Sequence, residues 1–273
     1  MCPKVKLVVV DIDGTLLDKT HMLTDDARCA KHICDQHGVT FTLATGRVAS
    51  SAEKVACALG IESPIIANGG AAIKKPRGPY SRLLALSAEA AGRVLRIARQ
   101  HNVERYCYSG EHYMTETCGQ HLEYYSRGLG IPILTVPDIE AFFGPELLSV
   151  VLRVDASSKD LGNKMERLAR ELESEADTDF RVDRTLPHMI EITHPQAGKA
   201  EALKELCAML DVPLECTMAI GDGLGDIEMV DTAAVGVLVA NAAPELREGR
   251  RVTRLPHAAG VLEAVTCYIS ESL

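Results

Sequence analysis

The sequence predicts an α/β protein in which a doubly wound, mostly parallel, Rossmann-like sheet is interrupted by an inserted α+β domain. An unbroken aliphatic run at residues 7–10 is typical of a strand buried on both faces. Apolar strands and amphipathic helices alternate over residues 6–67 and again after residue 198, as in doubly wound sheets. The stretch between them has a different pattern. We therefore expect a core domain of residues 1–80 and 195–273 and an inserted domain of residues 81–194.

The first part of the core is expected to contain three strands and two helices. The strands are residues 7–10, 39–44 and 64–67; one helix runs from Thr24 to about residue 37, and the other follows Arg47 and runs to about residue 59. Thr24 can cap the first helix, and Gly38 and Gly60 can end the two helices. Polar residues follow each strand at its carboxyl end, where doubly wound sheets bind their ligands.

The insert is expected to hold a mostly antiparallel sheet and three helices. Ser87 opens a helix to residue 101, and Gly110 separates the two strands of a hairpin. A helix is expected near residues 120–128, a strand at 147–154 and a charged amphipathic helix at 158–174. Strands at 180–184 and 189–193 complete the insert.

The α/β alternation then resumes. We expect a helix at 199–210, a strand at 216–220, and a Gly-rich turn at 221–226 that leads into a helix around Met229. A strand at 235–239 and a short helix from Pro244 follow, and a strand at 251–254 and a helix at 260–270 end the chain.

Composition limits the class of protein. The net charge is −9 and no apolar run is long enough to span a membrane, which argues against a nucleic-acid surface and against membrane insertion. Nine cysteines without a C-x-x-C spacing indicate reduced thiols. With no visible signal peptide, we expect a cytoplasmic protein. A monomer and a small homo-oligomer remain open.

Two carboxylates, Asp11 and Asp13, stand directly after the first apolar strand. Neighbouring acids at the end of a buried strand repel each other and lose hydration unless positive charge lies beside them. A bound Mg²⁺ would supply that charge, since it prefers oxygen ligands.

Four segments in order resemble the motifs of the haloacid dehalogenase superfamily. They are DIDGT at residues 11–15, LATGR with Thr45, QAGKAEAL with Lys199, and GDGLGDIEM with Asp222 and Asp226. The insert lies between the second and third motifs and is similar to the α+β cap (C2 type) of the Cof-like branch.

This resemblance implies a Mg²⁺-dependent phosphatase that acts on a small phosphorylated metabolite, such as a sugar phosphate, through an aspartyl-phosphate. Asp11 would attack phosphorus, Asp13 would move protons, and Thr45 and Lys199 would bind and stabilise the phosphoryl group. The implied metal ligands are Asp11, the backbone carbonyl of Asp13, Asp222 and, weakly or indirectly, Asp226. The expected substrate- and phosphate-binding residues are Thr45, Gly46, Arg47, Asn68 and Asn241 in the core, with Arg184, His188 and Glu191 in the cap.

Some interpretations stay open at this stage. Arg47 can contact substrate or only pair with a carboxylate. Gly225 stands where the family's last motif usually has Asn, so metal affinity or rate could be reduced. A phosphomutase of the same superfamily and a catalytically impaired metal- or phosphate-binding protein are the alternatives.

Overall fold

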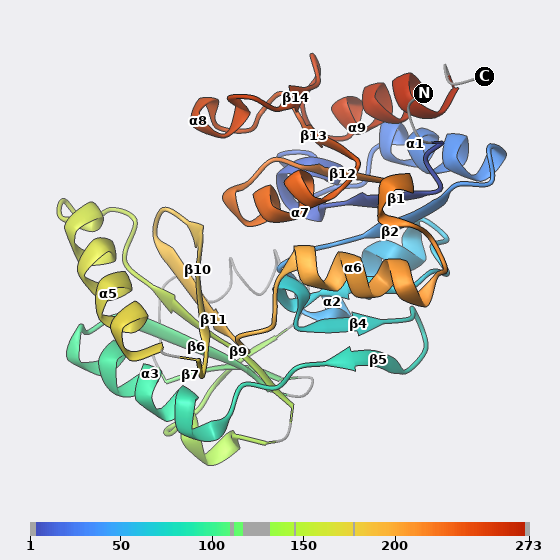
Figure 1. The fold of residues 1–273 in the computed structure, drawn as a ribbon. Helices are drawn as coiled ribbons and strands as arrows, with labels where there is room; N and C mark the ends of the chain where they lie inside the picture. Colours follow the sequence, from blue (N-terminus) through green and yellow to red (C-terminus); the bar gives the residue numbers. More distant parts are fainter. Residues whose placement is uncertain (1–3, 110–111, 117–131, 145, 177, 271–273) are drawn as a thin grey trace. The chain divides into compact units, whose positions relative to one another are not determined.

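The computed structural model describes residues 4–109, 112–116, 132–144, 146–176 and 178–270 (Figure 1). The chain divides into two compact units: unit 1 is Met1–Ser81 with Gly198–Leu273, and unit 2 is Arg82–Ala197. A parallel sheet in unit 1 and a separate, mostly antiparallel sheet in unit 2 confirm the predicted fold class. The helix expected near residues 120–128 lies outside the described residues.

The sheet of unit 1 has five strands, all parallel to their neighbours. In spatial order they are β14 (Arg251–Val252), β13 (Val235–Leu238), β12 (Thr217–Gly221), β1 (Leu7–Val10) and β2 (Thr40–Leu43). All four residues of β1 are buried. The unbroken aliphatic run of this strand therefore corresponds to a position with neighbours on both edges and layers on both faces.

Helices cover both faces of this sheet (Figure 1). The helices of unit 1 are α1 (Asp25–Gln36), α2 (Ala49–Ala58), α6 (Lys199–Met209), α7 (Ile227–Thr232), α8 (Pro244–Arg247) and α9 (His257–Val265). Leu7 and Val9 of β1 pack in one cluster with Leu203 and Leu206 of α6 and Met229 of α7. Helices α1 and α9 pack against each other on the opposite side of the sheet.

Three short strands form another sheet, in the order β3 (Ile65–Ala67), β4 (Ala72–Lys74) and β5 (Tyr80–Leu83); β3 and β4 belong to unit 1, and unit 1 ends within β5. A single bridge between Ala44 and Ile66 joins it to the end of β2. The sequence analysis missed β4 and β5. Three or four residues, with a Gly-rich turn before β4, are too few to show the alternation that identifies a strand.

Unit 2 has a six-stranded sheet with its helices packed on one face. The strands, in spatial order, are β10 (Arg181–Leu186), β11 (Met189–Thr193), β9 (Leu147–Arg153), β6 (Glu104–Ser109), β7 (His112–Thr115) and β8 (Ile133–Thr135). Neighbours are antiparallel except for β7 and β8. The strand β8 was not predicted.

The core of unit 2 lies between this sheet and the helices α3 (Ala88–Gln100) and α5 (Leu161–Ala176). Ser87 caps α3 as expected, because its hydroxyl oxygen accepts a hydrogen bond from the N–H of Ala90 at 3.1 Å. Met165, Leu168 and Leu172, which the spacing places on one side of α5, are all buried.

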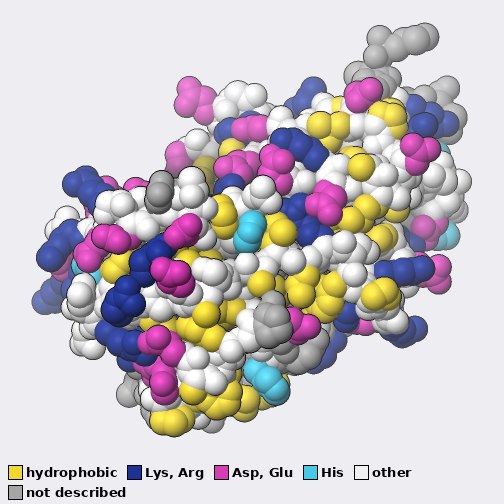
Figure 2. Space-filling model, turned by 60° about the horizontal axis from the view of Figure 1, so that its bottom comes forward, with side chains coloured by type: hydrophobic (Ala, Val, Ile, Leu, Met, Phe, Trp, Pro, Cys, Tyr) yellow, Lys and Arg dark blue, Asp and Glu magenta, His cyan; other side chains and the backbone are white. Residues whose placement is uncertain are grey.

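Charged side chains of both signs are mixed over the face drawn in Figure 2. Within the described residues, no helix is both long and apolar enough to cross a membrane. The seven cysteines that the structure describes are free thiols.

One ion-pair network joins separate elements of unit 2 around Glu116. Arg99 of α3 donates to its Oε1 at 2.8 Å, Arg105 of β6 donates to its Oε2 at 2.6 Å, and the N–H of Ile139 donates to Oε1 at 3.1 Å. Burial alone would raise the pKa of Glu116, but these donors outweigh it and lower the pKa from 4.5 to about 2. The ionised form of Glu116 therefore stabilises unit 2.

We predict that Glu116→Gln lowers the free energy of unfolding of unit 2 at pH 7 by about 2 kcal/mol, since each pKa unit is worth about 1.4 kcal/mol and solvent screens part of it. Because the folded-state pKa is depressed, this stabilisation is complete above pH 4.5 and is lost as the pH falls toward 2. The difference between wild type and variant should shrink over the same range.

Urea unfolding followed by tyrosine fluorescence measures this difference, because five of the seven tyrosines belong to unit 2. Glu140→Gln is the matched control: Glu140 also pairs with Arg99, but its side chain is 39% exposed. Its substitution should cost less than about 1 kcal/mol. A pH-independent loss in Glu116→Gln would contradict the ion-pair explanation.

Candidate functional site

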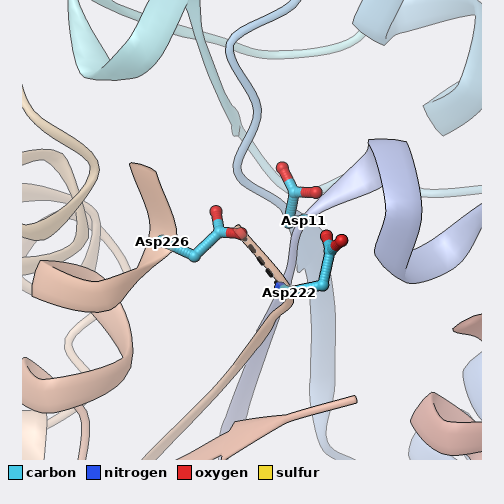
Figure 3. Close-up of side chains that lie close together, drawn as sticks. All are labelled: Asp11, Asp222 and Asp226. Carbon is cyan, nitrogen blue, oxygen red and sulfur yellow. Dashed lines mark hydrogen bonds between the residues drawn. The ribbon is translucent and has the colours of Figure 1, made fainter. Parts of the chain in front are cut away.

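Three carboxylates from two distant parts of the chain converge at the carboxyl end of the parallel sheet (Figure 3). Asp11 follows β1, Asp222 follows β12, and Asp226 lies in the short turn before α7. One oxygen of each lies within 4.8 Å of an oxygen of the others. The pairing of Val10 with Ile220 brings the ends of β1 and β12 to the same level, which explains why Asp11 and Asp222 are neighbours.

Lys199 lies between two of these carboxylates. Its Nζ donates to Oδ1 of Asp11 at 2.7 Å and to Oδ1 of Asp226 at 2.5 Å. The side chains of all three residues are less than a tenth exposed. Lys199 is the first residue of α6. The third motif thus places a buried cation between Asp11 of the first motif and Asp226 of the fourth.

Asp226 is held at both oxygens. Oδ1 accepts the Lys199 ammonium, and Oδ2 accepts the backbone N–H groups of Asp222 at 3.1 Å and Gly223 at 3.0 Å. These bonds tie the Gly-rich loop to the start of α7. Because Asp226 accepts three hydrogen bonds, one of them from an ammonium, it is better suited to orient Lys199 and the loop than to ligate a metal directly.

Asp222 is held by two polar side chains. Thr15 donates its hydroxyl to Oδ1 at 2.8 Å, and Asn241 donates its amide N–H to Oδ2 at 3.1 Å. The same Asn241 amide nitrogen also donates to the backbone carbonyl of Gly14 at 2.9 Å. Asn241 therefore links the loop after β1 to the loop after β12.

The two loops approach each other too closely for a side chain at residue 14. Gly14 has φ of +84°, and a Cβ placed on it would lie 2.3 Å from Oδ2 of Asp222. Only glycine combines this left-handed backbone with the free space that the Asp222 carboxylate needs.

The site carries more negative than positive charge. Burial, and then the charge of Asp226, raise the pKa of Asp11 well above its usual range despite Lys199. Burial also raises the pKa of Asp222, to about 6. Burial would lower the pKa of Lys199, but Asp11 and Asp226 reverse this effect and raise it. A divalent cation would relieve the repulsion, and the hard oxygen donors of Asp11 and Asp222 fit Mg²⁺.

Asp13 lies outside this group of three carboxylates. Arg47 holds it with two bonds, from Nε to Oδ2 and from Nη2 to Oδ1, both 2.6 Å long, and Nδ1 of His21 lies 3.1 Å from Oδ1. Burial would raise the pKa of Asp13, but Arg47 and His21 outweigh it and the pKa is lowered. Arg47 thus pairs with the Asp13 carboxylate, and its contact with a substrate stays a prediction.

Thr45 and Asn68 lie beside the same end of the sheet. Thr45 is buried; its N–H donates to the carbonyl of Ile66, and its Oγ accepts the N–H of Arg47 at 3.1 Å. Asn68 is only 1% exposed, and neither atom of its amide has a hydrogen-bond partner among the described residues. An orphaned buried amide is costly, which favours a bound polar group there.

Gly46 and Gly70 are backbone features of this region. Gly46 lies in the bend between Thr45 and Arg47. Gly70 has φ of +101°, and a Cβ on it would lie 2.3 Å from the backbone of Gly198. This close approach packs the Asn68 turn against the residue that precedes Lys199.

Gly225, by contrast, has open space around it. A Cβ on Gly225 would meet nothing within 4 Å among the described residues, and the residue is exposed. The loop is held instead by the two backbone bonds to Asp226. Asp226 therefore anchors this loop through its backbone, and the effect of Gly225 on metal affinity stays a prediction.

The expected cap residues lie in unit 2. Arg184 of β10 donates to Glu166 of α5 at 2.7 Å. His188 lies in the turn between β10 and β11, and burial, together with the charge of Arg153, lowers its pKa. Glu191 is on β11 and is buried. Their roles toward a substrate stay predictions.

Three residues that contact the site were not identified from the sequence: Thr15, His21 and His257. Thr15 belongs to the DIDGT motif, so its position offered a signal. His21 and His257 stand in no motif. His21 is presented by a turn in which Oδ1 of Asp18 accepts the N–H groups of Thr20 and Met22, and His257 reaches the site from the start of α9.

The chain is similar to known hydrolases and phosphatases over most of its length. The family model described as haloacid dehalogenase-like hydrolase matches residues 8–265. The HMP-PP phosphatase of Cronobacter sakazakii is 25% identical over 252 residues, which cover 92% of this chain and 88% of that protein.

Solved structures show the same fold. A haloacid dehalogenase-like hydrolase from Bacteroides thetaiotaomicron superposes with a TM-score of 0.83 at 23% identity, covering 97% of this chain and 99% of that one. The sugar phosphatase BT4131 superposes with a TM-score of 0.80 at 19% identity, with coverage of 97% and 99%.

We predict that Gly225→Asn changes the Mg²⁺ affinity by about threefold or less, because Asp226 already anchors the loop, whereas loss of a needed supporting group costs 10–100-fold. Gly225→Ala is the matched control without an amide. It should raise the free energy of unfolding by about 0.5–1 kcal/mol, since φ at residue 225 is not left-handed and the space is open.

Calorimetric titration with Mg²⁺ and thermal unfolding measure these two effects. A gain in affinity of tenfold or more in the Asn variant alone would show that the missing amide does limit metal binding.

Proposed function

The chain belongs to the haloacid dehalogenase-like hydrolases, and from this premise we propose that it is a Mg²⁺-dependent phosphatase that hydrolyses a small phosphate monoester through an aspartyl-phosphate on Asp11. The observation that carries the proposal is the buried pair of Asp11 and Lys199, only 2.7 Å apart, within a group of three carboxylates. A strand-end carboxylate held beside a buried cation is suited to attack an anionic phosphoryl group.

Asp11 is oriented for nucleophilic attack. Lys199 holds Oδ1, so the carboxylate has a fixed direction while its Oδ2 is not engaged by Lys199. Attack of Oδ2 on phosphorus forms the P–O bond of the aspartyl-phosphate and breaks the bond to the leaving oxygen. Water then cleaves the aspartyl-phosphate, so that one difficult step becomes two easier ones.

The phosphoryl group needs hydrogen-bond donors and positive charge. Lys199 supplies a charge beside Asp11, Thr45 has a buried hydroxyl whose hydrogen is available, and Asn68 has an unpartnered buried amide. Together these groups can receive the phosphoryl oxygens and stabilise the charge that develops during transfer.

Mg²⁺ held by Asp11, Asp222 and the backbone carbonyl of Asp13 would supply further positive charge and reduce the repulsion between Asp11 and an anionic substrate. Thr15 and Asn241 hold the Asp222 carboxylate in place. Asp226 keeps Lys199 at the site through its Oδ1.

Asp13 is the proposed acid and base. It lies two residues after the nucleophile and is 41% exposed, so it can reach solvent and a leaving group. Both of its oxygens are bonded to Arg47. Protonation of the leaving alkoxide therefore requires the Asp13 carboxylate to leave this guanidinium fork, and a phosphate that draws Arg47 toward itself would favour that change.

We predict that Asp11→Asn abolishes phosphate release, with a loss of about 10³-fold or more, because the amide cannot form the aspartyl-phosphate. The assay measures phosphate released from a panel of sugar phosphates, nucleotides, cofactor phosphates and phosphorylated pyrimidines, with and without Mg²⁺. Wild-type turnover should require Mg²⁺.

Asp35→Asn is the matched control, since Asp35 is an exposed aspartate that pairs with Lys31 on the surface of α1. It should behave as wild type. Formation of an isomeric sugar phosphate without phosphate release would indicate a phosphomutase. Mg²⁺ binding without turnover of any substrate would indicate the impaired binding protein.

We further propose that Arg184 binds the leaving group of the substrate. Arg184→Ala should then raise KM for the physiological ester by about tenfold, which corresponds to one charge-assisted hydrogen bond, and leave KM for a generic aryl phosphate unchanged. Glu166→Gln is the control, because it removes the ion-pair partner of Arg184 but keeps the guanidinium. If Arg184→Ala and Glu166→Gln change KM equally, Arg184 only pairs with Glu166 and does not bind the leaving group.

A further inference from the structure

The loop that carries the first motif is held by a residue near the other end of the chain. His257, the first residue of α9, places its ring Nδ1 at 2.8 Å from the backbone carbonyl oxygen of Gly14. The two residues are 243 positions apart in sequence. His257 is outside all four motifs, so the proposed function assigns it no role.

His257 takes part in a closed network of hydrogen bonds. Its backbone N–H donates to Oδ1 of Asn241 at 2.9 Å. The Asn241 amide in turn donates to the Gly14 carbonyl and to Oδ2 of Asp222. The bond from His257 fixes which end of the Asn241 amide is the donor. Gly14 carbonyl oxygen therefore lies beside two nitrogens, one from Asn241 and one from the His257 ring.

The backbone conformation and the ring environment of His257 are both energetically unfavourable. Its φ is +52°, in the left-handed region that non-glycine residues rarely adopt. Because a carbonyl oxygen only accepts, Nδ1 must bear the hydrogen that points at Gly14. The other ring nitrogen, Nε2, is buried and has no hydrogen-bond partner among the described residues. A local arrangement that is unfavourable in two ways is retained where it serves a contact elsewhere.

The contact at Gly14 bears directly on the carboxylates. Thr15, whose amide follows the Gly14 carbonyl, donates its hydroxyl to Asp222. Asp11 and Asp222 repel each other, and their loops would relax apart if the turn between them were free. Two donors on one carbonyl fix the orientation of that turn and hence the separation of the two carboxylates.

We propose that His257 is a positioning residue for the divalent cation: its ring N–H holds the Gly14 carbonyl and so keeps Asp11 and Asp222 at the spacing that binds the metal. This inference rests on the metal-dependent function proposed above. It assigns His257 no contact with substrate or with the reacting atoms.

Two variants of nearly the same shape test the hydrogen bond. In His257→Asn the amide nitrogen is attached to Cγ, as Nδ1 is in histidine, so it can donate to Gly14, and Asn tolerates a left-handed backbone. In His257→Leu a methyl group occupies that place and no donor is present. His32→Ala, at an exposed position of α1, controls for the loss of a histidine.

The dissociation constant of Mg²⁺ is measured by calorimetry on the full chain without substrate, with thermal unfolding of the metal-free protein as a second readout. We expect His257→Leu to raise the dissociation constant of Mg²⁺ about tenfold and His257→Asn to keep it within about threefold of wild type. Steady-state turnover of the Leu variant should recover at saturating Mg²⁺, with little change in KM for the ester.

Each other outcome overturns the inference. A Leu variant with a lower melting temperature but an unchanged Mg²⁺ affinity would make His257 a purely structural residue. Equal losses of Mg²⁺ affinity in His257→Leu and His257→Asn would show that the hydrogen bond to Gly14 does not determine metal binding. If the wild-type protein itself binds no Mg²⁺, both this inference and the metal-dependent function fail, whereas a normal wild-type affinity with unaffected variants removes only this inference.

Discussion

The contact between Lys199 and the two buried carboxylates of Asp11 and Asp226 is the constraint on which the rest of the site depends. Three carboxylates lie close together there and one ammonium group pairs with two of them, so the ionised group carries net negative charge in a place with little water. Such a group is stabilised when hydrogen-bond donors reach the carboxylate oxygens and when a further cation can enter. Hydrogen-bond donors reach two of the carboxylates: Asp226 accepts two backbone N–H groups, and Asp222 accepts a hydroxyl and an amide N–H. The carboxylate oxygens of Asp11 and Asp222 are suited to bind the further cation.

The parallel sheet makes this charge cluster possible, and the loops set its dimensions. Because β1 lies between β12 and β2, the carboxyl end of β1 is flanked by two other strand ends, and residues from both can reach Asp11. The loops then approach so closely that residue 14 must be glycine. Asn241 and His257, which come from the end of the chain, close the group on the remaining side. Both ends of the chain are thus needed to build one site.

The sequence predicted the parts of this structure that have local patterns. The acids after an apolar strand, the Gly-rich turn with Asp222 and Asp226, and the elements around them are visible within a few residues, and the structure brings Asp11, Lys199, Asp222 and Asp226 together. The fork between Arg47 and Asp13 joins residues 34 positions apart, and the His257 contact joins residues 243 apart. Those contacts depend on loop conformations, including left-handed φ at His21 and His257, which no periodicity encodes. The two backbone hydrogen bonds by which Asp226 anchors the loop around Gly225 likewise became visible only in the structure.

The two aspartates of the first motif have environments that push their pKa values in opposite directions. Burial raises the pKa of Asp11, the proposed nucleophile, whereas Arg47 lowers the pKa of Asp13, the proposed acid, against the effect of burial. A nucleophile needs the ionised form and an acid needs the protonated form. The protein environment alone favours the opposite form of each: the protonated form of Asp11 and the ionised form of Asp13. In the proposed reaction, ligands would oppose both tendencies: a divalent cation at Asp11 and Asp222 would favour the ionised carboxylate, and a phosphate that competes for Arg47 would release Asp13. In the proposed reaction, the division of labour between the two acids therefore depends on the bound cation and phosphate as well as on the protein.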